Sequence, residues 1–105
     1  MINHKEQLLH ILKLSRRHPM PIANRMNKLS EEAGELSESV NHFEGYLPHK
    51  TLKEPLAGEA ADTIICTLDV MWARYSATMS DEEILDLLFE QLKTKAEKWQ
   101  NILPD

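Results

Sequence analysis

The sequence predicts an all-α protein in which four helices form a bundle, and three observations support this. Apolar residues recur at helical spacing along most of its 105 residues. Two capping boxes, Thr51-x-x-Glu54 and Ser80-x-x-Glu83, mark the starts of helices. The chain has three glycines and few β-branched runs, which argues against an all-β fold. Its length predicts one domain over residues 1–105.

The first two helices are bounded by residues that interrupt helical structure. We predict the first over residues 3–17, because Pro19 and Pro21 then break the chain. The second is predicted over residues 21–44 and ends at Gly45, a favoured residue just after a helix.

The third helix is predicted over residues 51–77, with Pro55 in its first turn, and the fourth over residues 80–101. Short connections between four helices favour a bundle. The third helix is apolar around almost its whole circumference, which predicts that it is buried. One copy of the chain cannot easily cover all its sides, so we expect a homodimer or homotetramer.

Composition excludes several classes of function. The net charge of −5 disfavours a module that binds nucleic acid, because such modules carry a basic face. No apolar run reaches the roughly 18 residues of a membrane span, and the N-terminus is too polar for a signal peptide. We therefore expect a cytoplasmic protein without a membrane partner. The single cysteine, Cys66, excludes an intrachain disulfide and a cysteine-based zinc cluster.

Two pairs of carboxylates stand out, each with its members three residues apart. Glu59 and Asp62 lie in the apolar third helix, where an isolated carboxylate must pair, protonate or bind a metal. On the second helix we centre the apolar stripe at Leu29. Glu32 and Glu35 then fall together on one flank of that stripe.

A hairpin of the second and third helices would bring these pairs face to face. Four carboxylates without nearby His or Cys form an oxygen-only site that suits Mg²⁺ or Mn²⁺. A di-iron site is rejected, because no His follows a Glu by three residues. The alternative to a metal is a buried salt bridge to Arg25, Lys28 or Lys95.

At these residues the chain resembles the MazG-like all-α nucleoside triphosphate pyrophosphatases. Their pattern is Glu-Glu-x-x-Glu followed, after a variable spacer, by Glu-x-x-Asp. In this chain the matching segments are KLSEEAGELSESV and GEAADTIICTLDV, which cover the central half of the sequence. The resemblance implies hydrolysis of a nucleoside triphosphate to the monophosphate and pyrophosphate. It also implies that Mg²⁺ is held by Glu32, Glu35, Glu59 and Asp62.

One of the carboxylates on the second helix would then activate the attacking water. Glu31 is the spare candidate, although it lies opposite the apolar stripe and is expected to face solvent. Lys28 is interpreted as a surface ion pair or a phosphate contact.

The fourth helix offers two candidates for substrate binding. Lys95 lies on its apolar stripe, where it would either pair with the carboxylates or bind a phosphate. Trp99 stands where the family often has Asn, so the family's contacts at this helix do not transfer directly. It would stack on a base or pack in the core.

Three hypotheses of function follow. The first is a Mg²⁺-dependent enzyme that acts on nucleoside or deoxynucleoside triphosphates in the control of nucleotide pools. The second is a related pyrophosphatase with a specialised substrate such as phosphoribosyl-ATP. The third is a non-catalytic helical interaction module that keeps the metal site.

Overall fold

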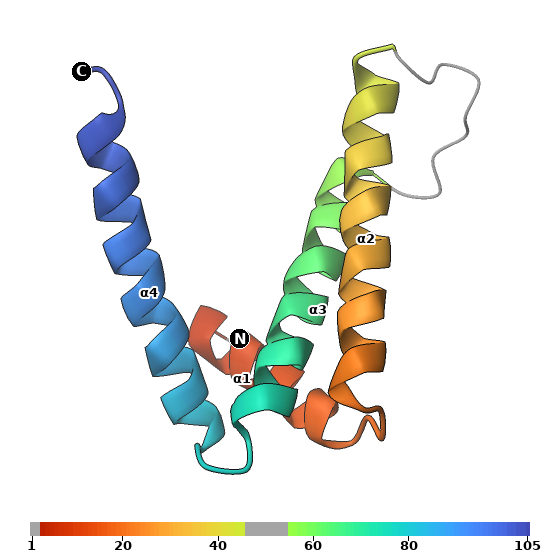
Figure 1. The fold of residues 1–105 in the computed structure, drawn as a ribbon, viewed down its shortest axis with the longest axis vertical. Coiled ribbons are helices and arrows are strands. Elements are labelled where there is room, and N and C mark those ends of the chain that lie inside the picture. Colours follow the sequence, from red (N-terminus) through yellow and green to blue (C-terminus); the bar gives the residue numbers. More distant parts are fainter. Residues whose placement is uncertain (1–2, 46–54) are drawn as a thin grey trace.

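The structure is a computed structural model that describes residues 3–45 and 55–105. This part of the chain contains helices and no strand (Figure 1). The helices are α1 His4–Arg16, α2 Ile22–Phe43, α3 Leu56–Tyr75 and α4 Asp81–Ile102. The all-α prediction is confirmed, and the four helices pack together.

Local capping chemistry fixes the starts of α1 and α4. The side chain of Asn3 accepts a hydrogen bond from the backbone N–H of Glu6 at 2.8 Å. Before α4, the hydroxyl of Ser80 accepts from the backbone N–H of Glu83 at 3.2 Å. The Glu83 carboxylate accepts from the backbone N–H of Ser80 at 3.0 Å. The predicted capping box of the fourth helix is therefore confirmed.

The ends of the α2–α3 hairpin are only partly described. Gly45 follows α2 with φ of 82°, a left-handed conformation that glycine adopts without steric cost. α3 begins at Leu56, and Pro55 precedes it as the N-cap residue with extended backbone angles. The prediction that Pro55 lies within the first turn is therefore wrong. The other predicted capping box, Thr51 with Glu54, lies outside the described residues.

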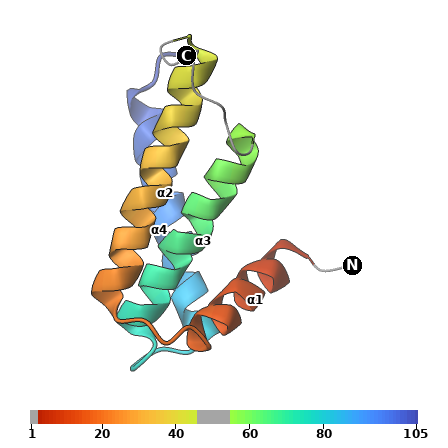
Figure 2. The ribbon, with the colours of Figure 1, turned by 90° about the vertical axis from the view of Figure 1, so that its right-hand side faces the viewer.

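The helices are arranged as a hairpin with an open side. α2 and α3 run antiparallel and lie side by side in both views (Figures 1 and 2). α1 crosses near the α3–α4 turn, and from that turn α3 and α4 diverge as the arms of a V (Figure 1). The core lies where α1, α3 and α4 meet, and its fully buried members are Leu12, Leu68, Ile84 and Leu85. Within the described residues α4 does not contact α2.

The second half of α4 has no covering partner within the protomer. Ile84 is buried and Leu88 is half-buried, but every residue from Phe89 onward is exposed. Trp99 is 64% exposed and Ile102 is 76% exposed. The interpretation of Trp99 as a core residue is therefore wrong for the protomer, because its helix has left the core before that position.

α3 is not buried on all sides, which corrects the expectation drawn from its composition. Ile64 and Ile65 are exposed, whereas Glu59 and Leu68 are buried. The reason is the diverging α4, which covers only the end of α3 nearest their connecting turn (Figure 1). α2 and α1 cover the rest of the buried side.

Candidate metal centre

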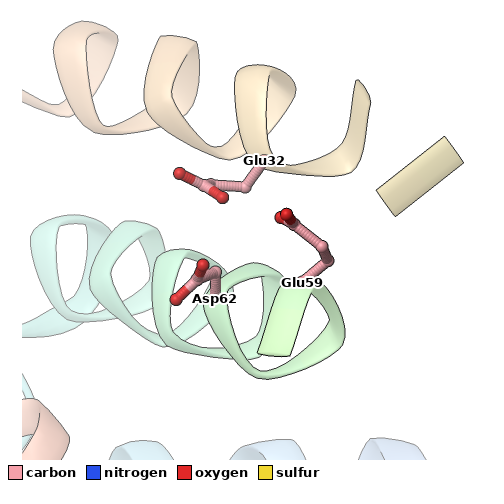
Figure 3. Close-up of side chains that lie close together, drawn as sticks. All are labelled: Glu32, Glu59 and Asp62. Carbon is pink, nitrogen blue, oxygen red and sulfur yellow. The ribbon is translucent and has the colours of Figure 1, made fainter. Parts of the chain in front are cut away.

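Three carboxylates from the α2–α3 hairpin converge between the two helices (Figure 3). One oxygen from each of Glu32, Glu59 and Asp62 lies within 4.8 Å of the other two. Glu32 comes from α2, and the other two lie three residues apart on one side of α3. The antiparallel pairing thus brings Glu32 next to residues that are 27 or more positions later in the sequence. This is the arrangement predicted for a hairpin of the second and third helices.

Glu32 faces α3 because the buried line of α2 consists of polar residues. Arg25, Glu32 and Ser39 are the buried residues of this helix, and they are spaced seven apart. Seven residues make close to two helical turns, so the three share one side. This line is rotated by about 60° from Leu29, the predicted centre of the apolar stripe. The rotation moves Glu32 from the flank into the interface.

The convergent carboxylates are poorly satisfied by the protein. Glu32 is 6% exposed and Glu59 is 7% exposed. The Oε2 atoms of both are buried and have no hydrogen-bond partner. The nearby hydroxyl of Thr63 donates to the backbone carbonyl of Glu59 at 2.9 Å. Burying a carboxylate without a partner costs roughly several kcal/mol of folding free energy. A cation between these oxygens would offset that cost, so it fits the site.

Within the described residues, one ammonium group reaches this cluster. Nζ of Lys28 lies 3.0 Å from Oε1 of Glu32, one turn along α2, and 3.6 Å from Oε2 of Glu31. The ion pair raises the pKa of Lys28, chiefly through its hydrogen bond to Glu32. A single lysine that is itself more than half exposed cannot offset three carboxylates, so the centre keeps an excess of negative charge.

Glu35 lies at the edge of the same cluster. It is half-buried, and its pKa is raised above the ordinary value. The largest cause is the charge of Glu32, followed by burial and by interactions with Glu32 and Glu59. Glu35 therefore lies near Glu32 and Glu59, but its oxygens are not among those that meet within 4.8 Å. Its role as a fourth ligand stays a prediction.

The other basic candidates for a buried salt bridge are engaged or distant. Nη1 of Arg25 lies 2.5 Å from Oδ1 of Asp69, and the guanidinium stacks 5.1 Å from the ring centre of Trp72. Lys95 is exposed on α4, a helix that does not contact α2 within the described residues. Within the described part of the protomer, Glu59 and Asp62 therefore have no ion pair with either residue.

The remaining predicted site residues lie outside the convergent cluster. Glu31 faces solvent, as its position opposite the stripe predicted, and pairs with Lys28. Lys95 and Trp99 share the exposed half of α4 and do not reach the carboxylates of their own protomer. The structure thus brings Glu32, Glu59 and Asp62 together, with Glu35 beside Glu32 and Glu59, and leaves these others apart.

Sequence reasoning missed the buried roles of Arg25 and Ser39. Both are polar residues of a long amphipathic helix, and such residues are usually exposed. The available signal was their spacing of seven residues on either side of Glu32, which puts all three on one side of α2.

Comparison with known proteins does not assign this chain to a family. No protein family, curated protein or solved structure matches this chain. No described helix is both long enough and apolar enough to cross a bilayer. The metal preference of the centre therefore follows from its ligand atoms. These are carboxylate oxygens alone, the ligand type that Mg²⁺ and Mn²⁺ prefer.

Proposed function

We propose that this protein is a Mg²⁺-dependent nucleoside triphosphate pyrophosphohydrolase. The observation that carries the proposal is the pair of buried carboxylates, Glu32 and Glu59, whose Oε2 atoms have no partner and whose carboxylates meet that of Asp62 between two helices. The pattern Glu-Glu-x-x-Glu with Glu-x-x-Asp, which resembles the MazG-like pyrophosphatases, supports the same conclusion.

The residues present fit a hard divalent cation. Glu32, Glu59 and Asp62 would hold it, with Glu35 as the fourth carboxylate at the edge of the cluster. When bound, Mg²⁺ offsets the negative charge of phosphate oxygens and so allows an acidic site to accept a polyanion. Mn²⁺ has similar ligand preferences and is expected to substitute.

Two further side chains have roles that follow from their positions. Lys28 extends from the Glu32 carboxylate into solvent, so its ammonium can reach a phosphate oxygen without leaving the site. Glu35 lies at the edge of the cluster, beside Glu32 and Glu59, on the helix that carries Glu32. We assign Glu35 the role of general base, which accepts a proton from the attacking water.

The protomer is proposed to work as a homodimer or as a homotetramer made of dimers. The exposed apolar face of α4 supports this assembly, and we name the face formed by Phe89, Leu92, Trp99 and Ile102 the α4 stripe. An apolar surface of this kind needs a partner. The same half-helix carries Lys93, Lys95 and Lys98, whose charge complements the carboxylates of a second hairpin. In such an assembly Lys95 and Trp99 would serve the site of the neighbouring subunit.

The experiment that tests the function is an assay of pyrophosphate release over a panel of nucleoside and deoxynucleoside triphosphates with Mg²⁺ or Mn²⁺. We expect release from at least one of them, and loss of release in Glu59→Gln and Asp62→Asn. Glu90→Gln, an exposed position on α4, serves as the matched control.

The same assay separates the alternatives. Release from phosphoribosyl-ATP alone would point to the specialised pyrophosphatase. Binding of Mg²⁺ in calorimetry without hydrolysis of any of these substrates would point to the interaction module.

A further inference from the structure

Two contacts between α2 and α3 define the register of the hairpin, that is, which residue of α2 lies opposite which residue of α3. Nη1 of Arg25 lies 2.5 Å from Oδ1 of Asp69. Seven residues later on α2, the Glu32 carboxylate meets that of Asp62, which lies seven residues before Asp69 on the antiparallel α3. Seven residues make close to two helical turns, so the ion pair and the carboxylate contact belong to one register.

Apolar packing of α2 determines this register only weakly. The buried residues of α2 are Arg25, Glu32 and Ser39, all of them polar. Leu29 and Leu36 are half-buried. Apolar residues recur along the whole of α3, so a slip of α2 by one turn would exchange one apolar neighbour for another. The register therefore depends on the buried polar residues.

Of these three residues, Arg25 is the one that favours the observed register. Glu32 meets the like charges of Glu59 and Asp62, which oppose it. The hydroxyl of Ser39 has no hydrogen-bond partner among the described residues. The observed register thus needs an interaction that offsets the repulsion between carboxylates, and the ion pair of Arg25 supplies it.

The Arg25 guanidinium is itself held in one position. It donates to the backbone carbonyl of Ser15 in α1 at 3.3 Å and to those of His18 and Met20 in the connection that follows. It also lies 5.1 Å from the ring centre of Trp72 on α3. Because the planar guanidinium presents its donors in fixed directions, the place of its carboxylate partner is fixed as well.

A slip of α2 by one helical turn would remove that partner. Arg25 would then lie opposite Ile65 or Ala73, whose side chains cannot accept a hydrogen bond. The same slip would move Glu32 about 5 Å along the axis from the carboxylates of α3. Ligands of one Mg²⁺ must each approach it to about 2 Å, so the slipped hairpin could not bind the ion through both helices.

We propose that Arg25 and Asp69 are the positioning pair of the metal centre, because their ion pair holds the hairpin in the register in which Glu32 meets Glu59 and Asp62. The inference rests on the proposed function and adds to it two residues outside the carboxylate cluster. Mg²⁺ and the ion pair stabilise the same register, so removal of the pair weakens the binding of Mg²⁺.

The first measurement is the Kd for Mg²⁺ of the full-length protein, by calorimetry. Arg25→Met with Asp69→Asn removes the pair. The matched control is Arg16→Met with Asp81→Asn, which removes the same charges from the ion pair between α1 and α4. If the native register falls to about one tenth of the metal-free population, Kd rises about tenfold. The control should keep the natural Kd.

Spin labels report the register directly and without Mg²⁺. Cysteines replace two exposed residues, Ser37 on α2 and Arg74 on α3, in a Cys66→Ser background. Double electron–electron resonance in EDTA should give one distance between the labels when the pair is intact. Without the pair, a second distance should appear that differs by about 5 Å, the length of one turn. Saturating Mg²⁺ should restore the single distance, because the ion binds only the native register.

The inference requires both changes. A natural Kd in the chain without the pair, or a single label distance in EDTA, would overturn the positioning role and leave the proposed function standing. If the natural chain itself bound no Mg²⁺, the proposed function would fail together with the positioning role.

Circular dichroism in EDTA shows whether the chain without the pair remains helical. If it does not, Arg25→Lys carries the same two measurements. Lysine keeps a positive charge opposite Asp69 but lacks the planar fork that fixes the direction of its partner. We expect this variant to raise Kd about threefold and to show the second label distance. A natural Kd and a single distance in Arg25→Lys would then overturn the inference.

Discussion

Arg25 and Asp69 form an ion pair that joins the first turn of α2 to α3, with 2.5 Å between Nη1 and Oδ1. The Arg25 side chain is buried and donates to the backbone carbonyls of Ser15 in α1 and of His18 and Met20 in the connection between α1 and α2. Its guanidinium also stacks on the ring of Trp72. The pair therefore fixes the positions of three helices around the carboxylate cluster.

Replacing Arg25 with Met should destabilise the fold by about 3 kcal/mol, because it leaves Asp69 and three carbonyls without their donor. Chemical denaturation measures the change. Arg16→Met is the matched control, since Arg16 pairs with Asp81 at 2.7 Å but is more than half exposed. It should cost less than about 1 kcal/mol. Equal losses in the two variants would contradict a structural role for the buried pair.

Glu59→Gln should remove the response of the fold to Mg²⁺. At a Mg²⁺ concentration about 100 times its Kd, the natural chain should gain about 2.7 kcal/mol of stability, and the variant should gain nothing. In the absence of divalent ions the variant should melt at a higher temperature, because a buried charge has been removed. Differential scanning fluorimetry with and without EDTA measures both effects. A variant that keeps the full Mg²⁺ shift would exclude Glu59 as a ligand.

The metal-free protein should become more stable as the pH falls from neutral towards the raised pKa of Glu35. The charge of Glu32, burial and Glu59 raise this pKa, so the folded state binds the proton more tightly than the unfolded state does. The stabilisation is complete below the ordinary carboxylate pKa and is lost as the pH rises through the raised value. Calorimetric melting in EDTA at a series of pH values measures this trend.

Glu35→Gln is the control for this pH dependence, because it removes the titrating group. Its melting temperature should vary less over the same pH range. With Mg²⁺ present, acidification should destabilise the natural chain, because protons compete with the cation for the carboxylates. Identical pH profiles of the variant and the natural chain in EDTA would exclude Glu35 as the source of the effect.

The α4 stripe should determine the oligomeric state. Size-exclusion chromatography with light scattering should give the mass of a dimer or tetramer for the natural chain. The double variant Trp99→Glu with Ile102→Glu should give the mass of one chain, because it places charges on the apolar face. Lys5→Glu, at an exposed position on α1, changes the charge by the same amount as the double variant and should leave the mass of the oligomer unchanged. A natural chain that elutes as a monomer at high concentration would refute the proposed assembly.

The sequence predicted those features that depend on neighbouring residues. The Ser80 capping box and the stop at Gly45 are local, and their geometry does not require a tertiary partner. The burial of Glu59 was also predictable, because the surrounding residues of its helix are apolar.

Two features, the partner surface of α4 and the rotation of α2, depend on tertiary packing, which the residue pattern of one helix does not determine. The apolar stripe of α4 predicts a partner surface, but not whether that surface belongs to the same chain. Of the two alternatives for Trp99, packing in the core is therefore wrong for the protomer, and stacking on a base stays a prediction. The rotation of α2 was missed as well, because polar residues such as Arg25 and Ser39 are usually exposed and yet line its buried side.

The spacing of the buried residues on α2 makes the length of this helix part of the site. Arg25 anchors one end of the line, and Glu32 follows seven residues later. One residue inserted between them would turn Glu32 by about 100° relative to Arg25 and carry its carboxylate off the interface. Seven inserted residues would keep the same side but move it about 10 Å along the axis, away from Glu59. An intact set of acidic residues is thus insufficient, since insertions or deletions in this segment would separate the anchor from the ligand.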